Sequence, residues 1–177
     1  GVNVLELQSG SNIIGNVTAF SSADTLRLGG GANSAFDVSQ IGAAAQYRNF
    51  GVFEKTGTSV WTLTGTTTAT TPWAVNAGTL SVSSDGNLGD AGGGLTFDGG
   101  TLQTTATFTT GRAVTLNAGG GTFETAPGTT LTATGVIGGA GGLTKTGTGT
   151  LTLEGANTYA GATAISAGTL ALSGAGD

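Results

Sequence analysis

Apolar and polar residues alternate in short runs along almost the whole chain. From Trp61 to Thr64 and from Leu151 to Leu153, large apolar side chains alternate with threonine, and Leu80–Val82 repeats the pattern around a serine. A period of two places the apolar side chains on one face of a strand and the hydroxyl groups on the other. The pattern therefore predicts strands with one apolar face turned inward.

Most of the chain divides into such segments, which glycine, asparagine or aspartate separate. Thr, Val and Phe favour half-buried strands, and Gly favours tight corners. No window places apolar residues at i, i+3, i+4 and i+7, so we expect almost no helix, with Ala43–Gln46 as a candidate for one turn. The predicted strands are Val4–Gln8, Asn16–Phe20, Thr25–Leu28, Phe36–Ile41, Val52–Thr56, Val60–Thr64, Trp73–Asn76, Thr79–Ser83, Leu95–Asp98, Thr101–Thr105, Ala113–Asn117, Thr122–Thr125, Thr129–Thr134, Leu143–Thr146, Thr150–Glu154, Ala164–Ser166 and Thr169–Ser173.

One block of this pattern occurs twice without a gap, at a spacing of 90 residues. Lys55 to Val82 reads KTGTSVWTLTGTTTATTPWAVNAGTLSV and Lys145 to Leu172 reads KTGTGTLTLEGANTYAGATAISAGTLAL, with 13 of 28 positions identical. Fixed-period self-similarity is typical of chains that stack one structural unit on the next. Because the unit forms strands, residues 1–177 are predicted to be one continuous β-solenoid, with 55–82 and 145–172 as repeat copies.

The length of a coil predicts the size of this solenoid. Coils take roughly 20 to 25 residues, so we expect about eight coils in a rod roughly 35–40 Å long. Ninety residues would make about four coils, which predicts that Leu63 and Leu153 occupy equivalent places in successive layers. Short strands also suit a sandwich or a barrel, but neither fold has a reason to repeat a strand–turn–strand block in register.

Charge and composition narrow the possible partners. Only 8% of the residues are charged, and ten acids against five bases give a formal net charge of −5. Phosphates and anionic lipids attract basic faces, so this balance disfavours nucleic acid and an anionic membrane surface as partners. The chain starts at Gly1 with no initiator methionine, so it is expected to be an excised fragment, and it contains no signal peptide and no apolar run of transmembrane length.

The second repeat copy carries the most distinctive residues. It reads GGLTKTGTGTLTL from Gly141, then NTYAG from Asn157 and AGTLAL from Ala167. This run resembles the passenger-associated transport repeat of bacterial autotransporters, the type V secretion proteins of Gram-negative bacteria. The first copy resembles it less fully, since it carries Pro72 and Trp73 in place of the NTYAG turn. Leu95–Thr122 is similar to the sequence between repeats in that family, and Val52–Gly57 to the segment that opens a repeat.

The resemblance implies a right-handed, single-stranded parallel β-helix that belongs to a passenger domain on the cell surface. The parent protein would add an N-terminal signal peptide and would be tethered to the outer membrane by a C-terminal β-barrel. The repeats of the family assist folding and secretion of the passenger, and they have no catalytic residues to transfer. Partners expected on this basis are a host cell surface, the extracellular matrix, or copies on neighbouring bacteria.

The residue types present remove most kinds of site chemistry. Without histidine or cysteine the chain has no conventional nucleophilic triad, and a zinc site would rest on carboxylates alone. No glycine cluster is followed by the Lys-Ser/Thr of a phosphate-binding loop, and neither calcium-binding repeat nor EF-hand spacing occurs. We therefore expect no enzyme, no catalytic residues, no cofactor and no metal site.

Carboxylate chemistry is the one enzymatic alternative. Paired Asp or Glu residues can cleave glycosidic bonds, and Asp85, Asp90 and Asp98 lie within fourteen residues. A polysaccharide-active β-helix enzyme is therefore the alternative function. The favoured interpretation is that Asp85 and Asp90 cap turns, as do Asp24 and Asp37, because Asp readily bonds to nearby backbone groups.

The remaining conspicuous side chains receive structural interpretations. Trp61 should stack in the core beside Leu63, whereas Trp73 beside Pro72 could be exposed and contact a glycan or a partner. Outward threonine rows are interpreted as ordinary exposed strand residues rather than as a surface for self-association. The interior stack is predicted to contain Phe20, Phe36, Phe50, Phe53, Phe97, Phe108 and Phe123, and the solvated charges to be Glu54, Lys55, Lys145 and Glu154.

Two hypotheses of function follow. In the first, the chain is a non-catalytic stalk or scaffold that supports adhesion. In the second, the repeat at Gly141–Leu172 serves as a folding nucleus during secretion.

Overall fold

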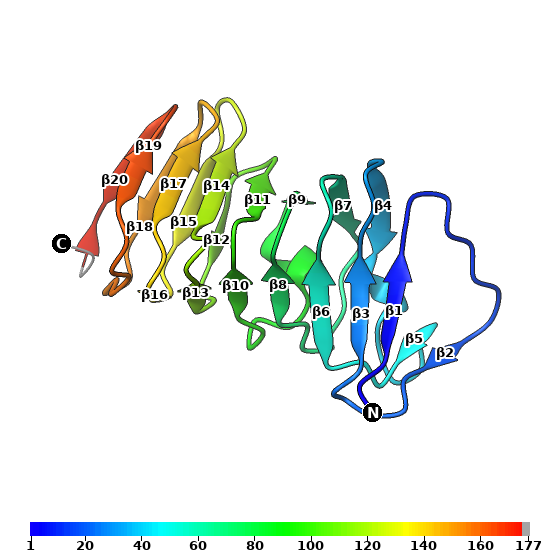
Figure 1. Cartoon of the computed structure of the whole chain (residues 1–177). Coiled ribbons are helices and arrows are strands. Elements are labelled where there is room, and N and C mark those ends of the chain that lie inside the picture. The colour runs from blue at the N-terminus through cyan, green and yellow to red at the C-terminus, as the bar shows by residue number, and fades with distance from the viewer. Residues whose placement is uncertain (175–177) are drawn as a thin grey trace.

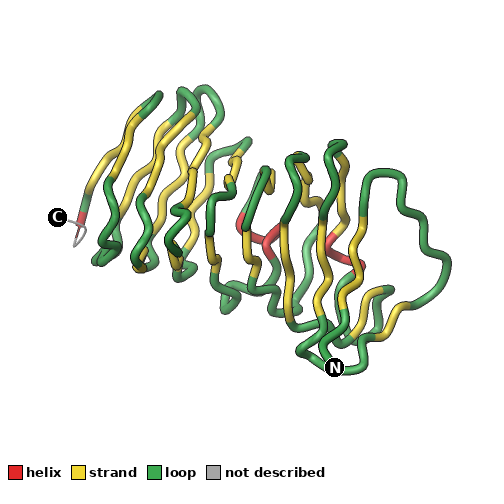
Figure 2. Tube along the Cα trace, viewed as in Figure 1, coloured by secondary structure: helices red, strands yellow, loops and turns green. Residues whose placement is uncertain are grey.

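The computed structural model describes residues 1–174, which wind into a rod of stacked, strand-walled coils (Figure 1). The first strand, β1 (Val4–Leu7), and the last, β20 (Thr169–Leu172), lie at opposite ends of the rod, and strands and loops alternate regularly along it (Figure 2). Every strand pairing is parallel. The rod is an all-β parallel solenoid of about eight turns, as the sequence predicts.

Three sheets form the walls, and we call them face 1, face 2 and face 3. Face 1 consists of β1 (Val4–Leu7), β3 (Thr25–Leu28), β6 (Val52–Lys55), β8 (Trp73–Val75), β10 (Leu95–Phe97), β13 (Val114–Leu116) and β16 (Ile137–Gly139). Face 2 consists of β4 (Ser34–Asp37), β7 (Val60–Thr64), β9 (Thr79–Val82), β11 (Thr101–Thr104), β14 (Gly121–Thr125), β17 (Leu143–Thr146) and β19 (Thr163–Ile165).

Face 3 is interrupted. Its continuous part consists of β12 (Phe108–Thr110), β15 (Thr130–Ala133), β18 (Thr150–Leu153) and β20 (Thr169–Leu172). Near the N-terminal end, only the pair β2 (Val17–Thr18) and β5 (Tyr47–Arg48) occupies the corresponding part of the coil. Between these two parts the chain forms a loop after β7 and a short 3₁₀ turn, η2 (Asp85–Leu88).

The core is a set of side-chain columns that run along the rod. In face 1 the parallel register places one inward residue of each coil on the next, and all members of this column are buried: Leu26, Phe53, Trp73, Leu95, Val114 and Ile137. Each such side chain contributes about 1.5–3 kcal/mol by leaving water. The period-two pattern of the sequence therefore becomes a continuous apolar interior.

The strand predictions are largely confirmed, with specific exceptions. β5, β12 and β16 were not predicted, because they contain two or three residues each and lack two inward large apolar side chains. The predicted strand Phe36–Ile41 stops at Asp37, whose carboxylate accepts a hydrogen bond from the Ser39 N–H and starts the 3₁₀ turn η1 (Val38–Gln40). The predicted helical turn at Ala43–Gln46 is wrong, since this segment forms non-helical turns.

The two repeat copies share a local structure but lie on different faces. The first copy forms β6 to β9, which alternate between faces 1 and 2, and the second forms β17 to β20, which alternate between faces 2 and 3. Leu63 lies in face 2 and Leu153 in face 3, so the expectation that they occupy equivalent places in successive layers is wrong. Register partners such as Leu80–Leu102 and Leu131–Leu151 are 22 and 20 residues apart. Ninety residues therefore span four complete coils plus the step from one face to the next.

Candidate functional site

Each repeat copy builds one buried lysine corner, defined by Lys55 in the first copy and Lys145 in the second. Both side chains are fully buried, at 0% exposure. Lys55 stands in a column between Leu28 and Val75, and Lys145 stands between Phe123 and Ile165. The prediction that these lysines are solvated charges is therefore wrong.

Backbone carbonyl groups satisfy both ammonium groups. Lys55 Nζ donates to the carbonyl oxygens of Thr56, Gly57 and Ala77, with distances of 3.4 Å to the last two. Lys145 Nζ donates to the equivalent oxygens of Thr146, Gly147 and Ala167, at 2.8 Å and 3.3 Å for the last two. Because the last acceptor belongs to the following coil, each lysine joins two successive coils.

Glycine is required on both sides of the lysine corner. Gly57 and Gly147 both have φ of +68°, and a Cβ on either would collide with a carbonyl oxygen of the preceding coil. Gly78 has φ of +64°, and a Cβ there would lie 2.7 Å from Lys55 Nζ. A left-handed backbone without a side chain is the conformation that glycine adopts most easily. The repeated Lys-Thr-Gly and Ala-Gly-Thr-Leu sequences are thus parts of one corner.

Burial changes the titration of both lysines. Loss of hydration lowers the pKa of Lys55 to about 8. Burial also lowers the pKa of Lys145, and the nearby Glu124 carboxylate partly opposes this effect. The other two residues predicted as solvated charges behave differently, since Glu154 is exposed and Glu54 is half-buried in an ion pair with Arg27 at 2.7 Å.

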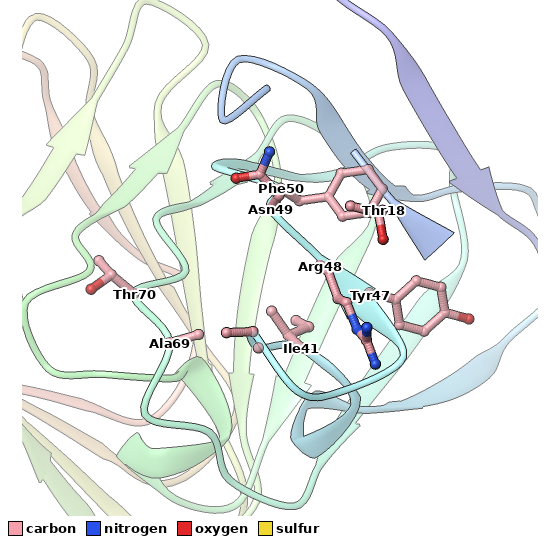
Figure 3. A pocket seen from close by; sticks show the side chains of 10 residues that line it. Thr18, Ile41, Tyr47, Arg48, Asn49, Phe50, Ala69 and Thr70 are labelled. Carbon is pink, nitrogen blue, oxygen red and sulfur yellow. The ribbon is translucent and has the colours of Figure 1, made fainter. Parts of the chain in front are cut away.

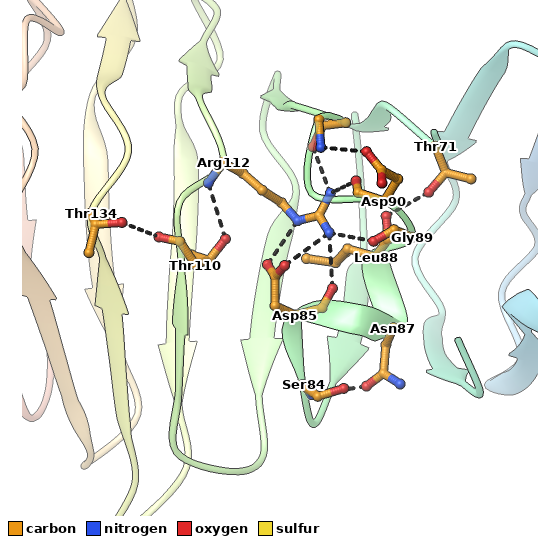
Figure 4. A network of polar contacts seen from close by, with 12 residues as sticks. Thr71, Ser84, Asp85, Asn87, Leu88, Gly89, Asp90, Thr110, Arg112 and Thr134 are labelled. Carbon is orange, nitrogen blue, oxygen red and sulfur yellow. Dashed lines mark hydrogen bonds and ion pairs between the residues drawn. The ribbon is translucent and has the colours of Figure 1, made fainter. Parts of the chain in front are cut away.

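Asp85 forms an ion pair with the buried Arg112, a pairing that the sequence pattern does not reveal. Arg112 Nε and Nη2 bond to the two carboxylate oxygens of Asp85 at 2.8 Å and 3.1 Å, while the Arg112 side chain is 0% exposed (Figure 4). The guanidinium also donates to four carbonyl oxygens between 2.7 Å and 3.1 Å, those of Asp85, Gly89, Asp90 and Gly93. Arg112 therefore holds the whole segment 85–93 against its own coil.

The other aspartates bond to backbone N–H groups. Asp90 accepts from Gly92 at 2.8 Å, and Asp98 accepts from Gly119 at 2.7 Å. Asp24 is 1% exposed and accepts from the N–H groups of Asn3, Phe20 and Ser21, which hold its pKa below the usual value, Asn3 most strongly. The turn-capping interpretation is confirmed for Asp90, Asp24 and Asp37, whereas Asp85 is an ion-pair partner.

The aromatic predictions divide into confirmed and wrong ones. Trp61 is buried, and its Nε1 donates to the Gly29 carbonyl at 2.9 Å. Trp73 is 0% exposed and packs against Phe53 with ring centroids 5.5 Å apart, so its proposed surface role is wrong. Phe20 is 87% exposed, contrary to prediction, because β2 ends at Thr18 before reaching it. Phe36, Phe53, Phe97 and Phe123 are buried as expected, while Phe50 and Phe108 are half-buried.

The interruption of face 3 leaves an open cavity of about 550 Å³ beside β5 (Figure 3). Arg48 and Phe50 extend from the β5 segment, and the loop after β7 forms the opposite wall. Asn49 is the one non-glycine residue with positive φ in the described part of the chain, at 62°, and its Nδ2 donates to the Ala19 carbonyl at 3.0 Å. The cavity is lined by Thr18, Ile41, Gly42, Ala43, Tyr47, Arg48, Asn49, Phe50, Ala69 and Thr70.

Within residues 1–174, no group of three or more acidic side chains is placed to hold a metal ion. The same residues contain no helix long and apolar enough to cross a membrane.

Comparison with known proteins gives the class of this solenoid. The model of the passenger-associated transport repeat matches residues 53–82 and 143–172, the two segments that form the lysine corners. The stacked parallel coils and the two matched repeats confirm the resemblance inferred from the sequence. The chain is passenger sequence of the bacterial autotransporter type, with passenger-associated transport repeats.

A particular relative shows the same relationship over a longer stretch. The chain is 48% identical over 156 residues to a protein named adhesin BmaC autotransporter, from Brucella suis biovar 1 (strain 1330). The similarity covers 87% of this chain but 4% of the relative. No solved structure matches the chain significantly.

Proposed function

We propose that this chain is a non-catalytic stalk segment of a surface-displayed adhesin. The observation that supports this proposal most strongly is that the charged side chains described above bond to other groups of the chain. Both lysines, Arg112 and the named aspartates form hydrogen bonds or ion pairs within the solenoid. Such a rod extends the surface of its parent protein by stacking coils, at about 4.8 Å per coil. The naming of a 48% identical relative as an adhesin agrees with this role.

The proposed setting is the bacterial surface. The parent protein is tethered at the outer membrane, and its partners are a host cell surface, the extracellular matrix or copies on neighbouring bacteria. The low charge and acidic balance of the chain support partners other than nucleic acid.

We further propose that the second repeat assists folding during secretion. Its four strands pair as β17 with β19 and β18 with β20, at separations of 20 and 19 residues, and Lys145 joins the same two coils, so these pairings are among the shortest in the solenoid. Local contacts form early because closing a short loop costs little entropy. A coil formed in this way offers a template on which further coils stack.

A matched pair of glycine substitutions in the full-length parent tests this role. Gly147→Val and Gly57→Val both introduce a side chain at φ of +68° that collides with a carbonyl of the preceding coil. If the second copy nucleates folding, Gly147→Val reduces surface display at least several-fold more than Gly57→Val. Display is measured by protease accessibility on intact cells. Equal loss from the two variants, or a greater loss from Gly57→Val, would contradict the proposal.

A further inference from the structure

We propose that the cavity beside β5 binds a carboxylate-bearing sugar, such as a uronic acid residue of an acidic oligosaccharide. This inference deepens the proposed adhesive function by naming a ligand class. The cavity lies at the break in face 3, between the β5 segment and the loop after β7. The break leaves an opening of about 550 Å³, within the size range of small-molecule sites.

Arg48 gives this cavity its charge. Its Nε donates to the Ala45 carbonyl at 2.6 Å and its Nη2 lies 3.5 Å from the Ala44 carbonyl. Within residues 1–174 the arginines that meet carboxylates are Arg27 and Arg112, and no acidic residue lines the cavity with Arg48. In a chain with ten acids and five bases, an arginine left facing an open cavity favours an anionic ligand.

A second cavity of about 260 Å³ adjoins the first, since Thr18 and Phe50 line both. Phe50 is half-buried between them, and Phe20 stands 87% exposed at the second. Aromatic rings offer an apolar surface to the C–H face of a pyranose, and the hydroxyl group of Thr18 offers hydrogen bonds. The exposed ring of Phe20 is therefore available to pack against a sugar, whereas the buried aromatic rings of the core are not.

The positions of Arg48 and Asp24 determine how the sugar is oriented in the two cavities. Asp24 lines the second cavity, and the N–H groups around it hold it as an anion. A carboxylate is therefore favoured beside Arg48, with the C–H face of a sugar ring over Phe50 and Phe20 and any further carboxylate directed away from Asp24.

An extended acidic peptide fits this site less well. Peptides bind sheet edges by adding a strand, which requires free backbone carbonyl groups. Here the carbonyls of Gln46 and Arg48 accept from the N–H groups of Val17 and Ala19, and that of Tyr47 accepts from the Gly42 N–H at 3.1 Å. The edge of β5 is thus already satisfied, and the cavity offers side chains instead.

Calorimetric titration of the 177-residue chain with trigalacturonate tests the proposal. A neutral trigalactoside and a triglutamate peptide serve as comparison ligands. We expect trigalacturonate to bind at least about tenfold more tightly than either comparison ligand. The neutral sugar lacks the carboxylate that Arg48 would bind, and the peptide does not place its carboxylate in the same position. Binding should weaken as salt is added.

Single substitutions distinguish binding at this cavity from a general effect of the net charge of the chain. Arg48→Gln should weaken trigalacturonate binding about tenfold, and Phe20→Ser should weaken it severalfold while leaving the fold intact, since Phe20 is exposed. Arg27→Gln changes the net charge equally on face 1 and should leave binding unchanged. No binding, equal binding of the neutral sugar, tighter binding of triglutamate, or an unaffected Arg48→Gln variant would each overturn the assignment. Surface display of the parent is measured separately, so a failed titration refutes the ligand and not the stalk.

Discussion

At the residue scale, the lysine corner shows how a polar side chain becomes part of an apolar column. Lys55 follows Phe53 by two positions, so the period of two already places it inward. A buried lysine is rare unless its charge has partners, so the sequence alone predicts a solvated lysine. The partners are backbone carbonyls exposed at a glycine corner, and no residue pattern in a single strand reveals them.

Lys55 also gives the fold a distinct dependence on pH. Burial lowers the pKa of Lys55 to about 8, whereas lysine in an unfolded chain titrates near 10.4. Between these values the unfolded chain binds more protons than the folded chain, so the free energy of unfolding contributed by Lys55 rises with pH. We expect urea denaturation, followed by circular dichroism, to show this increase from pH 8 to about 9.5.

The variant Lys55→Met tests the cause of this dependence. It leaves three carbonyl groups without their donor and should lower stability by about 1–3 kcal/mol at pH 7. It should also remove most of the rise with pH. Lys145→Met is the matched control, and it should reduce the rise less because Glu124 partly restores the pKa of Lys145. An unchanged pH profile in Lys55→Met would contradict the assignment.

At the element scale, the strands were predictable and the connections between them were not. The strand pattern depends on alternation within four or five residues, which a sequence displays directly. The segment 85–93 depends instead on Arg112, which lies about one coil further along the chain. Its alternative interpretation as a carboxylate cluster arose because closeness in sequence says little about which groups a coil brings together.

Replacement of Arg112 tests this dependence. Lysine has three rotatable donors instead of a rigid fork, so Arg112→Lys cannot satisfy Asp85 and four carbonyl groups together. We expect a loss of about 3–5 kcal/mol, as for breaking a buried ion pair. Hydrogen exchange of the amides in segment 85–93 should accelerate more than exchange in β15.

The control for this prediction is Asp90→Ala. Arg112 contacts the backbone carbonyl of Asp90, and the Asp90 side chain bonds to the Gly92 N–H alone. This variant should therefore cost about 0.5–1.5 kcal/mol. A larger loss in Asp90→Ala than in Arg112→Lys would show that the carboxylate, and not the arginine, organises the segment.

At the scale of the whole molecule, the solenoid and its number of coils were predictable from the repeat. The faces on which each repeat copy lies were not predictable. A repeat specifies a corner and its flanking strands, and the two copies place this corner between faces 1 and 2 for Lys55 and between faces 2 and 3 for Lys145. Register partners lie 19 to 30 residues apart, as the pairs Trp61–Leu80 and Val17–Tyr47 show, so coil length varies. The same repeat therefore occurs at two different corners, and 90 residues carry it from one pair of faces to the next.

Distances between paired spin labels test this arrangement most directly. Successive register pairs place Thr62, Ser81, Gln103, Glu124 and Thr146 in one outward column of face 2, so Thr62 and Thr146 are four strand spacings, about 19 Å, apart. Thr152 is the repeat equivalent of Thr62 but lies in face 3. The account predicts a narrow distribution near this value for labels at 62 and 146, and a longer distance for labels at 62 and 152. A shorter distance between 62 and 152 than between 62 and 146 would contradict it.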